Sequence, residues 1–210
     1  MGFDYYHSGG SSGAVFALEM MRYHMRCRYS LLSKAASIAV LTLALTGGHA
    51  PAHSQASTTA KSINKAAQDC VGKEMWKKGY GLKSGGLGCA ASVSNVLNKA
   101  GIAYVRTPVT LYMRRQILQG KLKVKEFVIK NGEKGGIDDT RLNEIARRGD
   151  VLVAFMNPLP GGNIGPKAHC GIIGAPGHVF TNDWNDGIWK HGNIHDYFDS
   201  YRYIRVLRFL

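Results

Sequence analysis

The stretch most informative about architecture is residues 88–101, which read GCAASVSNVLNKAG. Its apolar side chains recur three and four positions apart, as on one face of a helix, at Val93, Val96, Leu97 and Ala100. Gly101 follows them, and glycine is a common residue just beyond a helix end. The ten residues before Cys89 include five glycines and are unsuited to regular structure. The pattern predicts a buried helix that begins at Cys89.

Further elements are expected on both sides of this helix. Apolar spacing predicts helices over residues 58–77 and 110–118, and Asp138 and Asp139 offer caps for a helix that ends at 147–149. Apolar and alternating runs predict strands within residues 121–131, 150–155, 169–173, 178–182 and 201–209. Because helices come first and consecutive strands follow, the expected fold class is α+β with an antiparallel sheet.

The amino-terminal part of the chain has the layout of an export signal. Four cations precede an apolar run at residues 35–46, and small residues follow at 50–56. The apolar run is about a dozen residues long, whereas roughly 20 are needed to cross a bilayer. We therefore expect a signal peptide at residues 21–56, a domain at 57–210, no stable membrane span and a periplasmic or extracellular location. Residues 1–20 are interpreted as an upstream extension ahead of the working start codon.

The chain is strongly basic. Its 210 residues carry 27 Lys and Arg against 14 Asp and Glu, a formal net charge of +13. Acidic polymers, such as those of a cell wall, are therefore plausible partners. Nucleic acid is disfavoured, because the cations are spread along the sequence in short pairs and an exported protein rarely meets nucleic acid.

Cysteine use indicates a reactive thiol. With Cys27 in the signal peptide, the exported domain keeps Cys70, Cys89 and Cys170. This odd number leaves at least one thiol unpaired in an oxidising compartment, unless the protein dimerises through it. Whether Cys70 and Cys170 form a disulfide or stay as two buried thiols is left open. Cys170 is expected to point away from the site, because it follows His169 on one strand.

Cys89 and His169 are the candidate catalytic residues. A thiol in the first turn of a helix faces unpaired N–H groups and the positive end of the helix dipole, and both favour the thiolate. The Cys89 N–H can also hold the oxyanion of a substrate carbonyl. His169 opens a strand after the loop 158–166, a candidate lid, and can form a thiolate–imidazolium pair with that thiol. The alternative interpretation is a core cysteine and a structural histidine.

Zinc is a rival interpretation for the residues that cluster late in the chain, which are His169, Cys170, His178, His191 and His195. His191 and His195 are four residues apart, but the stretch between them has no helical pattern. His169 and Cys170 are adjacent on a strand and would point to opposite faces. We expect neither a metal nor another cofactor.

Three segments in this order, residues 88–102, 148–155 (RGDVLVAF) and 169–174 (HCGIIG), together resemble the NlpC-like papain-fold cysteine peptidases of bacterial cell walls. Their relatives, the cysteine, histidine-dependent amidohydrolase/peptidase (CHAP) domains, look similar. The resemblance covers about residues 70–210. It implies a papain-like NlpC/CHAP fold, with amino-terminal helices, the nucleophile at a helix N-terminus, and an antiparallel sheet packed against it. Cys170 stands where the family commonly has valine.

The resemblance also implies roles for individual residues. Cys89 would be the nucleophile, and His169 would act as general base and then as general acid. A polar residue on the next strand would orient the imidazole; Asn182 is the expected residue, through its amide oxygen, and Asp183 is the alternative. The expected substrate-binding residues are Tyr80, Gly88 and Trp184.

The implied function is an exported peptidoglycan hydrolase that cleaves an amide bond of stem peptides through a thioester intermediate. Peptidoglycan stem peptides are the expected partner, and an inhibitor or immunity protein is a further candidate. The alternative is a non-catalytic wall-binding relative of the same fold, in which the cleft is kept and the chemistry is lost.

Overall fold

The computed structural model describes residues 52–157 and 167–210 of the chain. Its centre is a six-stranded sheet of antiparallel pairs in the order β1-β6-β2-β3-β4-β5. The strands are β1 (Val124–Asn131), β2 (Val151–Phe155), β3 (Ala168–Ala175), β4 (His178–Asn182), β5 (Trp189–Asn193) and β6 (Tyr203–Phe209). The helices are α2 (Ala52–Gln68), α3 (Cys89–Lys99), α4 (Thr110–Gln119), α5 (Asp139–Ile145) and α6 (Ile194–Phe198), with a 3-10 turn η1 (Gly85–Leu87). The predicted α+β class is confirmed.

Four consecutive strands of the sheet form a meander, and the last strand of the chain is inserted between the first two. β2, β3, β4 and β5 each pair with the next, whereas β6 lies between β1 and β2. The predicted strands correspond to β1, β2, β3, β4 and β6. β5 and α6 were not predicted, because β5 has a single buried apolar residue, Trp189, and α6 is only five residues long. Both unpredicted elements lie next to the site described below.

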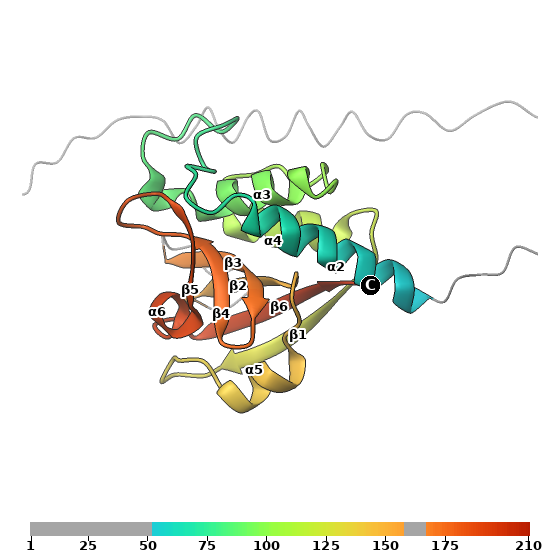
Figure 1. Cartoon of the computed structure of the whole chain (residues 1–210). Helices are drawn as coiled ribbons and strands as arrows, with labels where there is room; N and C mark the ends of the chain where they lie inside the picture. Colours follow the sequence, from blue (N-terminus) through green and yellow to red (C-terminus); the bar gives the residue numbers. More distant parts are fainter. Residues whose placement is uncertain (1–51, 158–166) are drawn as a thin grey trace, which may run out of the picture. The chain divides into compact units, whose positions relative to one another are not determined.

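The sheet separates the interior into two cores, and helices cover each of them. Figure 1 shows α2, α3 and α4 on one side and α5 on the other. The α3 core joins Val93 of α3 to sheet residues such as Cys170 and Ile172. The α6 core joins Phe198 of α6 to sheet residues such as Ile173. Neighbours along β3 therefore face different cores, because successive side chains of a strand point to opposite faces.

The helix expected over residues 58–77 is shorter at its end, since α2 stops at Gln68. Gly72 then adopts a left-handed backbone with φ of 81°. The chain turns there to meet β5: the Gly72 N–H donates to the Trp189 carbonyl at 2.9 Å, and the Trp189 N–H donates to the Lys73 carbonyl at 3.0 Å. The apolar spacing seemed to continue because Cys70 and Met75 remain buried after the helix has ended.

The other predicted helices are found close to their expected positions. α4 covers residues 110–119, and α5 follows Asp138, whose side chain accepts the Arg141 N–H at 3.0 Å as an N-cap. Within the described ranges, no helix is long and apolar enough to cross a membrane. Residues 21–51 of the predicted signal peptide and the predicted lid at 158–166 lie outside the described residues.

Candidate active site

The thiol of Cys89 lies at the start of α3, as the sequence predicts. η1 and Gly88 lead into it, and Gly88 is required because a Cβ there would come within 2.4 Å of the Trp76 Cβ. Cys89 is the first residue of the helix, so its N–H has no acceptor within the helix and faces the positive end of the dipole. The residue is 9 % exposed. An N–H in this position is available for a substrate oxyanion.

The Cys89 Sγ atom is surrounded by polar groups in spite of its burial. It lies 3.7 Å from the Thr110 hydroxyl and 3.9 Å from the Ala168 carbonyl oxygen. Hydrogen bonding by the Cys170 thiol, and after it by His169, lowers the pKa of Cys89 well below its usual value and outweighs the effect of burial. The environment therefore favours a thiolate, the nucleophilic form.

Cys170 lies inside this site, which corrects the expectation that it points away. The Thr110 hydroxyl lies 4.0 Å from the Cys170 Sγ atom as well as 3.7 Å from that of Cys89. Burial raises the pKa of Cys170 well above its usual value, and the hydrogen bond and charge of Cys89 raise it further. Cys170 is therefore the protonated partner of the pair. The alternation along β3 places it with α3, whereas His169 lies on the other face.

The imidazole of His169 is held by Thr181. The Thr181 hydroxyl donates its one hydrogen to the Cys170 carbonyl at 2.8 Å, and the His169 Nε2 atom lies 2.8 Å from the same hydroxyl oxygen. The oxygen must therefore accept from Nε2–H, and this assignment leaves the Nδ1 atom with its lone pair for the thiol. Gly171 pairs with Thr181 across the sheet, so Thr181 shares a face with His169, two residues earlier.

Asn182 does not make the contact predicted for it. Its amide oxygen accepts from the Ser92 hydroxyl at 2.9 Å, and its amide nitrogen donates to the Gly85 carbonyl at 2.7 Å. The Asn182 side chain points to the face of the sheet that α3 covers. Thr181, one residue earlier, points to the opposite face and makes the contact with His169 that is predicted for Asn182. Asn182 instead ties the end of β4 to α3 and to η1, the two elements that place Cys89.

Asp183, the alternative orienting residue, is also engaged elsewhere. Its carboxylate accepts from the Asn185 N–H and from the Lys190 ammonium, each at 2.8 Å. Burial acts to raise the pKa of Asp183, but Lys190 and the Asn185 N–H lower it below its usual value. The residue is an anion that closes the turn between β4 and β5.

Aromatic rings enclose the imidazole. The ring centroid of His169 lies 5.1 Å from that of Phe198, 5.3 Å from that of Trp184, 6.2 Å from that of Tyr197 and 6.3 Å from that of Tyr201. Trp184, predicted as a cleft residue, meets the imidazole at 70° and remains 42 % exposed. His169 itself is only 4 % exposed. These rings exclude water from the base and leave Trp184 as its solvent-facing wall.

Tyr201 belongs to the site and was missed. Burial, and then the charges of Cys89 and Cys170, raise the pKa of its phenol. Its ring stacks beside the imidazole, with centroids 6.3 Å apart and an interplanar angle of 14°. No sequence motif marks it, because its position follows from α6, which was not predicted. Tyr80, predicted to bind substrate, is half-buried, and within the described residues it makes no hydrogen bond or ring contact with Cys89 or His169.

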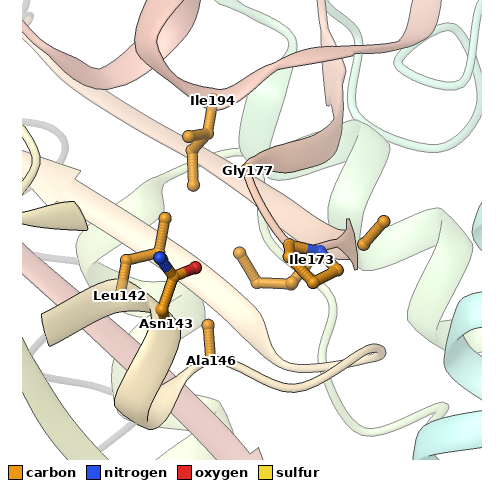
Figure 2. A pocket seen from close by; sticks show the side chains of 8 residues that line it. Leu142, Asn143, Ala146, Ile173, Gly177 and Ile194 are labelled. Carbon is orange, nitrogen blue, oxygen red and sulfur yellow. The ribbon is translucent and has the colours of Figure 1, made fainter. Parts of the chain in front are cut away.

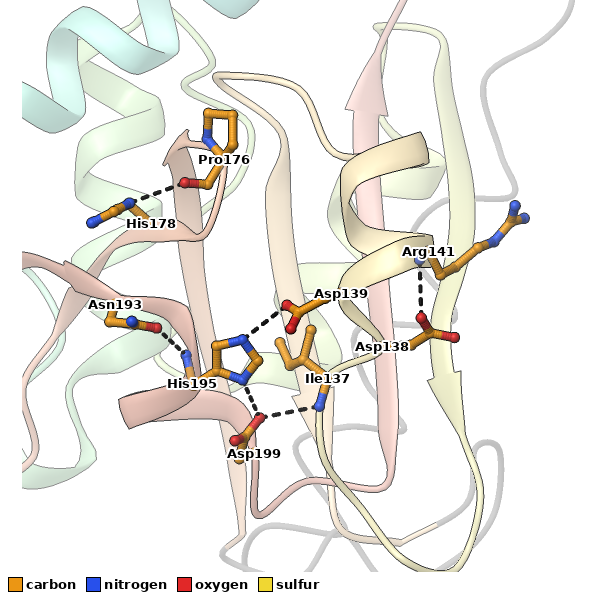
Figure 3. Close-up of polar contacts among 9 residues, drawn as sticks. All are labelled: Ile137, Asp138, Asp139, Arg141, Pro176, His178, Asn193, His195 and Asp199. Carbon is orange, nitrogen blue, oxygen red and sulfur yellow. Dashed lines mark hydrogen bonds and ion pairs between the residues drawn. The ribbon is translucent and has the colours of Figure 1, made fainter.

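The late histidines do not converge on one point. Figure 3 shows His195 between two carboxylates: its Nδ1 atom lies 2.8 Å from Asp199 and its Nε2 atom 2.9 Å from Asp139. His191 instead lies on β5 against His178, with ring centroids 5.4 Å apart. Over the ranges that the structure covers, no group of three or more His, Cys, Asp or Glu side chains is arranged to hold a metal ion.

A small cavity lies on the α6 side of the sheet, apart from the candidate residues. Its lining includes Leu142 and Ala146 of the α5 region, Ile173 of β3 and Ile194 of α6 (Figure 2). The volume is about 30 Å³. This is room for ordered water and not for a substrate.

Neither a scan against protein-family models nor a search of curated proteins finds a match for this chain. The chemistry must therefore be inferred from the geometry. A thiol biased towards thiolate, an imidazole with an oriented nitrogen and a helix N-terminus can together perform nucleophilic attack on a carbonyl.

Proposed function

We propose that this domain is an exported cysteine peptidase or amidase with a papain-like NlpC/CHAP fold, which cleaves an amide bond in peptidoglycan stem peptides. The observations that support it best are the Cys89 thiol at the start of α3, which lies 3.9 Å from the Ala168 carbonyl oxygen, and the buried imidazole of the next residue, His169, which Thr181 holds at 2.8 Å. A buried core cysteine has no need of an imidazole with one nitrogen fixed by a hydroxyl. The family resemblance of the sequence supplies the substrate class.

In the proposed reaction, His169 Nδ1 takes the proton of the Cys89 thiol, and the resulting thiolate sulfur attacks the carbonyl carbon of the scissile amide. The negative charge on the carbonyl oxygen is stabilised by the Cys89 N–H at the helix N-terminus. His169 then donates its Nδ1 proton to the leaving amine, which departs and leaves a thioester on Cys89. Water, deprotonated by His169, hydrolyses the thioester and releases a carboxylic acid. Thr181 keeps the ring in one orientation throughout both steps.

The test uses purified sacculi as substrate and mass spectrometry of the released fragments as readout. The wild-type protein should release fragments that end at one type of amide bond. Cys89→Ala should release none and should unfold at a temperature close to that of the wild type, because it removes one small side chain at the edge of the core. Cys70→Ala is the matched control: it removes another buried cysteine and should keep activity.

Two outcomes would contradict the proposal. Fragment release by Cys89→Ala at the wild-type rate would exclude Cys89 as the nucleophile. Wild-type protein that sediments with sacculi but releases no fragments would favour the non-catalytic wall-binding alternative.

A further inference from the structure

Two thiols share one hydroxyl in the centre of the site. The Thr110 Oγ1 atom lies 3.7 Å from the Cys89 sulfur and 4.0 Å from the Cys170 sulfur. Cys89 comes from the start of α3 and Cys170 from β3, and all three cysteines of the described residues are free. In the proposed hydrolysis Cys170 forms no bond to the substrate, although its thiol helps to lower the pKa of Cys89. A second buried thiol beside a nucleophilic one makes a further reaction possible, namely oxidation of the two thiols to a disulfide.

The two thiols are unequal in a way that suits sequential oxidation. Hydrogen bonding, with the Cys170 thiol as the largest cause, lowers the pKa of Cys89, whereas burial and the Cys89 charge raise that of Cys170. Oxidants attack the thiolate, so Cys89 reacts first. Once Cys89 is a neutral sulfenic acid, the negative charge that raises the pKa of Cys170 is gone, and Cys170 becomes easier to deprotonate.

We infer that Cys89 and Cys170 form a dithiol site that hydroperoxides convert into a reversible disulfide. As a regulatory device for hydrolysis this inference rests on the proposed function, whereas the disulfide itself does not. The contacts favour Cys170 over Cys70 as the partner, since among the described hydrogen bonds Thr110 reaches the Cys89 and Cys170 sulfurs and not that of Cys70.

The chemistry proceeds in two steps. In the first, the Cys89 thiolate attacks the hydroxyl oxygen of a hydroperoxide; an S–O bond forms, the O–O bond breaks, and the departing alkoxide or hydroxide takes a proton from the His169 imidazolium. In the second, the Cys170 sulfur attacks the Cys89 sulfur; an S–S bond forms, the S–O bond breaks, and the departing hydroxide takes the Cys170 proton as water. Overall, two thiols are oxidised to one disulfide, and one hydroperoxide is reduced to an alcohol and one water, or to two waters when it is hydrogen peroxide.

The disulfide would remove the nucleophile and protect it. A cysteine without a neighbouring thiol continues from sulfenic to sulfinic and sulfonic acid, which thiol reductants do not reverse. A disulfide returns to two thiols when a reductant such as dithiothreitol is added. The exported location expected for the chain is an oxidising one, in which such protection has a use.

The experiment treats the purified protein with hydrogen peroxide at a small molar excess, blocks remaining thiols and maps the digested peptides without reduction. We expect a mass loss of about 2 Da from the paired cysteines, a peptide that joins Cys89 to Cys170, and full recovery of both thiols with dithiothreitol. Cys70→Ala, the matched control, should form the same joined peptide. Cys170→Val should form none and should instead gain about 32 or 48 Da on Cys89.

The results separate this inference from the proposed function, because the mass readout needs no substrate. Wild-type Cys89 that accumulates sulfinic acid without a joined peptide overturns the inference, as does a joined peptide that contains Cys70. If Cys170→Val does not fold, Cys170→Ala serves in its place, and the wild-type map already decides between these outcomes. A Cys89–Cys170 disulfide in a protein that never cleaves sacculi leaves the inference standing and overturns only the hydrolysis.

Discussion

Thr181 makes the contact with the imidazole that the sequence analysis predicts for Asn182. A threonine hydroxyl has a single hydrogen, and here the Cys170 carbonyl takes it, so the oxygen can only accept from His169 Nε2–H. The hydrogen bond runs within one face of the sheet and is fully buried. Thr181 thus fixes the ring orientation without adding a charge beside the base.

Replacement of Thr181 by valine tests this role with almost no change of volume. Thr181→Val should lower kcat by about 10- to 100-fold, because a hydrogen bond to an imidazolium is worth roughly 1.5–3 kcal/mol. Thr181→Ser keeps the hydroxyl and should restore most of the rate. The pH profile of kcat should shift in the valine variant only, which a purely structural residue would not cause. Wild-type turnover in Thr181→Val would show that the ring is oriented by other contacts.

The strand that contacts the proposed base could be predicted from sequence, but the contacting residue could not. The sequence predicts Asn182, with Asp183 as the alternative, whereas the hydroxyl that contacts His169 belongs to Thr181. The pairing of β3 with β4 shifts by one residue at an irregularity between Ile173 and Ala175. A slip of one residue exchanges the two faces of a strand, so it decides whether residue 181 or 182 faces the imidazole. Nothing in the local sequence marks such a slip.

α6 is a five-residue helix that depends on its neighbours for stability. Asn193 caps it by accepting the His195 N–H at 2.9 Å, and His195 bridges it to α5 through Asp139 (Figure 3). A neutral imidazole has one N–H and can donate to one carboxylate, whereas the two contacts of His195 fit the doubly protonated ring. The helix presents Phe198 to the ring of His169 at 5.1 Å between centroids, so this connection supports the candidate site.

Stability should therefore depend on pH through His195. Hydrogen bonding to Asp199, and then to Asp139, raises the pKa of His195 in the folded protein. A raised folded pKa contributes stability that is fully present below the unfolded value of roughly 6.5 and is lost as pH rises through the folded pKa. His195→Gln should lower the melting temperature by about a few degrees at pH 5.5 and by less at pH 9, as measured by thermal unfolding. An effect of equal size at both pH values would contradict this account.

The elements of the sheet were largely predictable, and the exceptions have a common cause. β2, β3 and β4 are short runs of buried apolar residues, and the burial of α3 agrees with its apolar spacing. β5 exists because β4 offers it a hydrogen-bonding edge and Trp189 fills the α3 core, where its indole N–H donates to the Ala67 carbonyl at 2.9 Å. Such elements form because of contacts with residues that are distant in the sequence, and the local sequence carries no information about those contacts. Tyr197 and Phe198 were missed for this reason.

The charge of the whole molecule should affect the proposed reaction through encounter with the substrate. The chain carries a formal net charge of +13, and the proposed wall substrate is anionic. Raising NaCl from about 0.05 to about 0.5 M shortens the Debye length from more than about 10 Å to less than about 8 Å. Cleavage of sacculi should therefore become slower. Alkylation of Cys89 by neutral iodoacetamide is the control and should keep its rate. Equal loss in both assays would indicate that salt damages the site instead of weakening attraction.

The proposed nucleophile and the proposed base belong to different cores, and the side chains of β3 alternate between these cores. Cys89 is packed in the α3 core, while the His169 ring rests on Phe198 in the α6 core. The reacting pair therefore exists only when both halves of the interior have folded onto the same sheet. A chain whose α3 is native but whose α6 has opened would be inert, since its imidazole would have lost its support. We therefore expect the proposed hydrolysis to begin only in the last stage of folding, after both cores have formed.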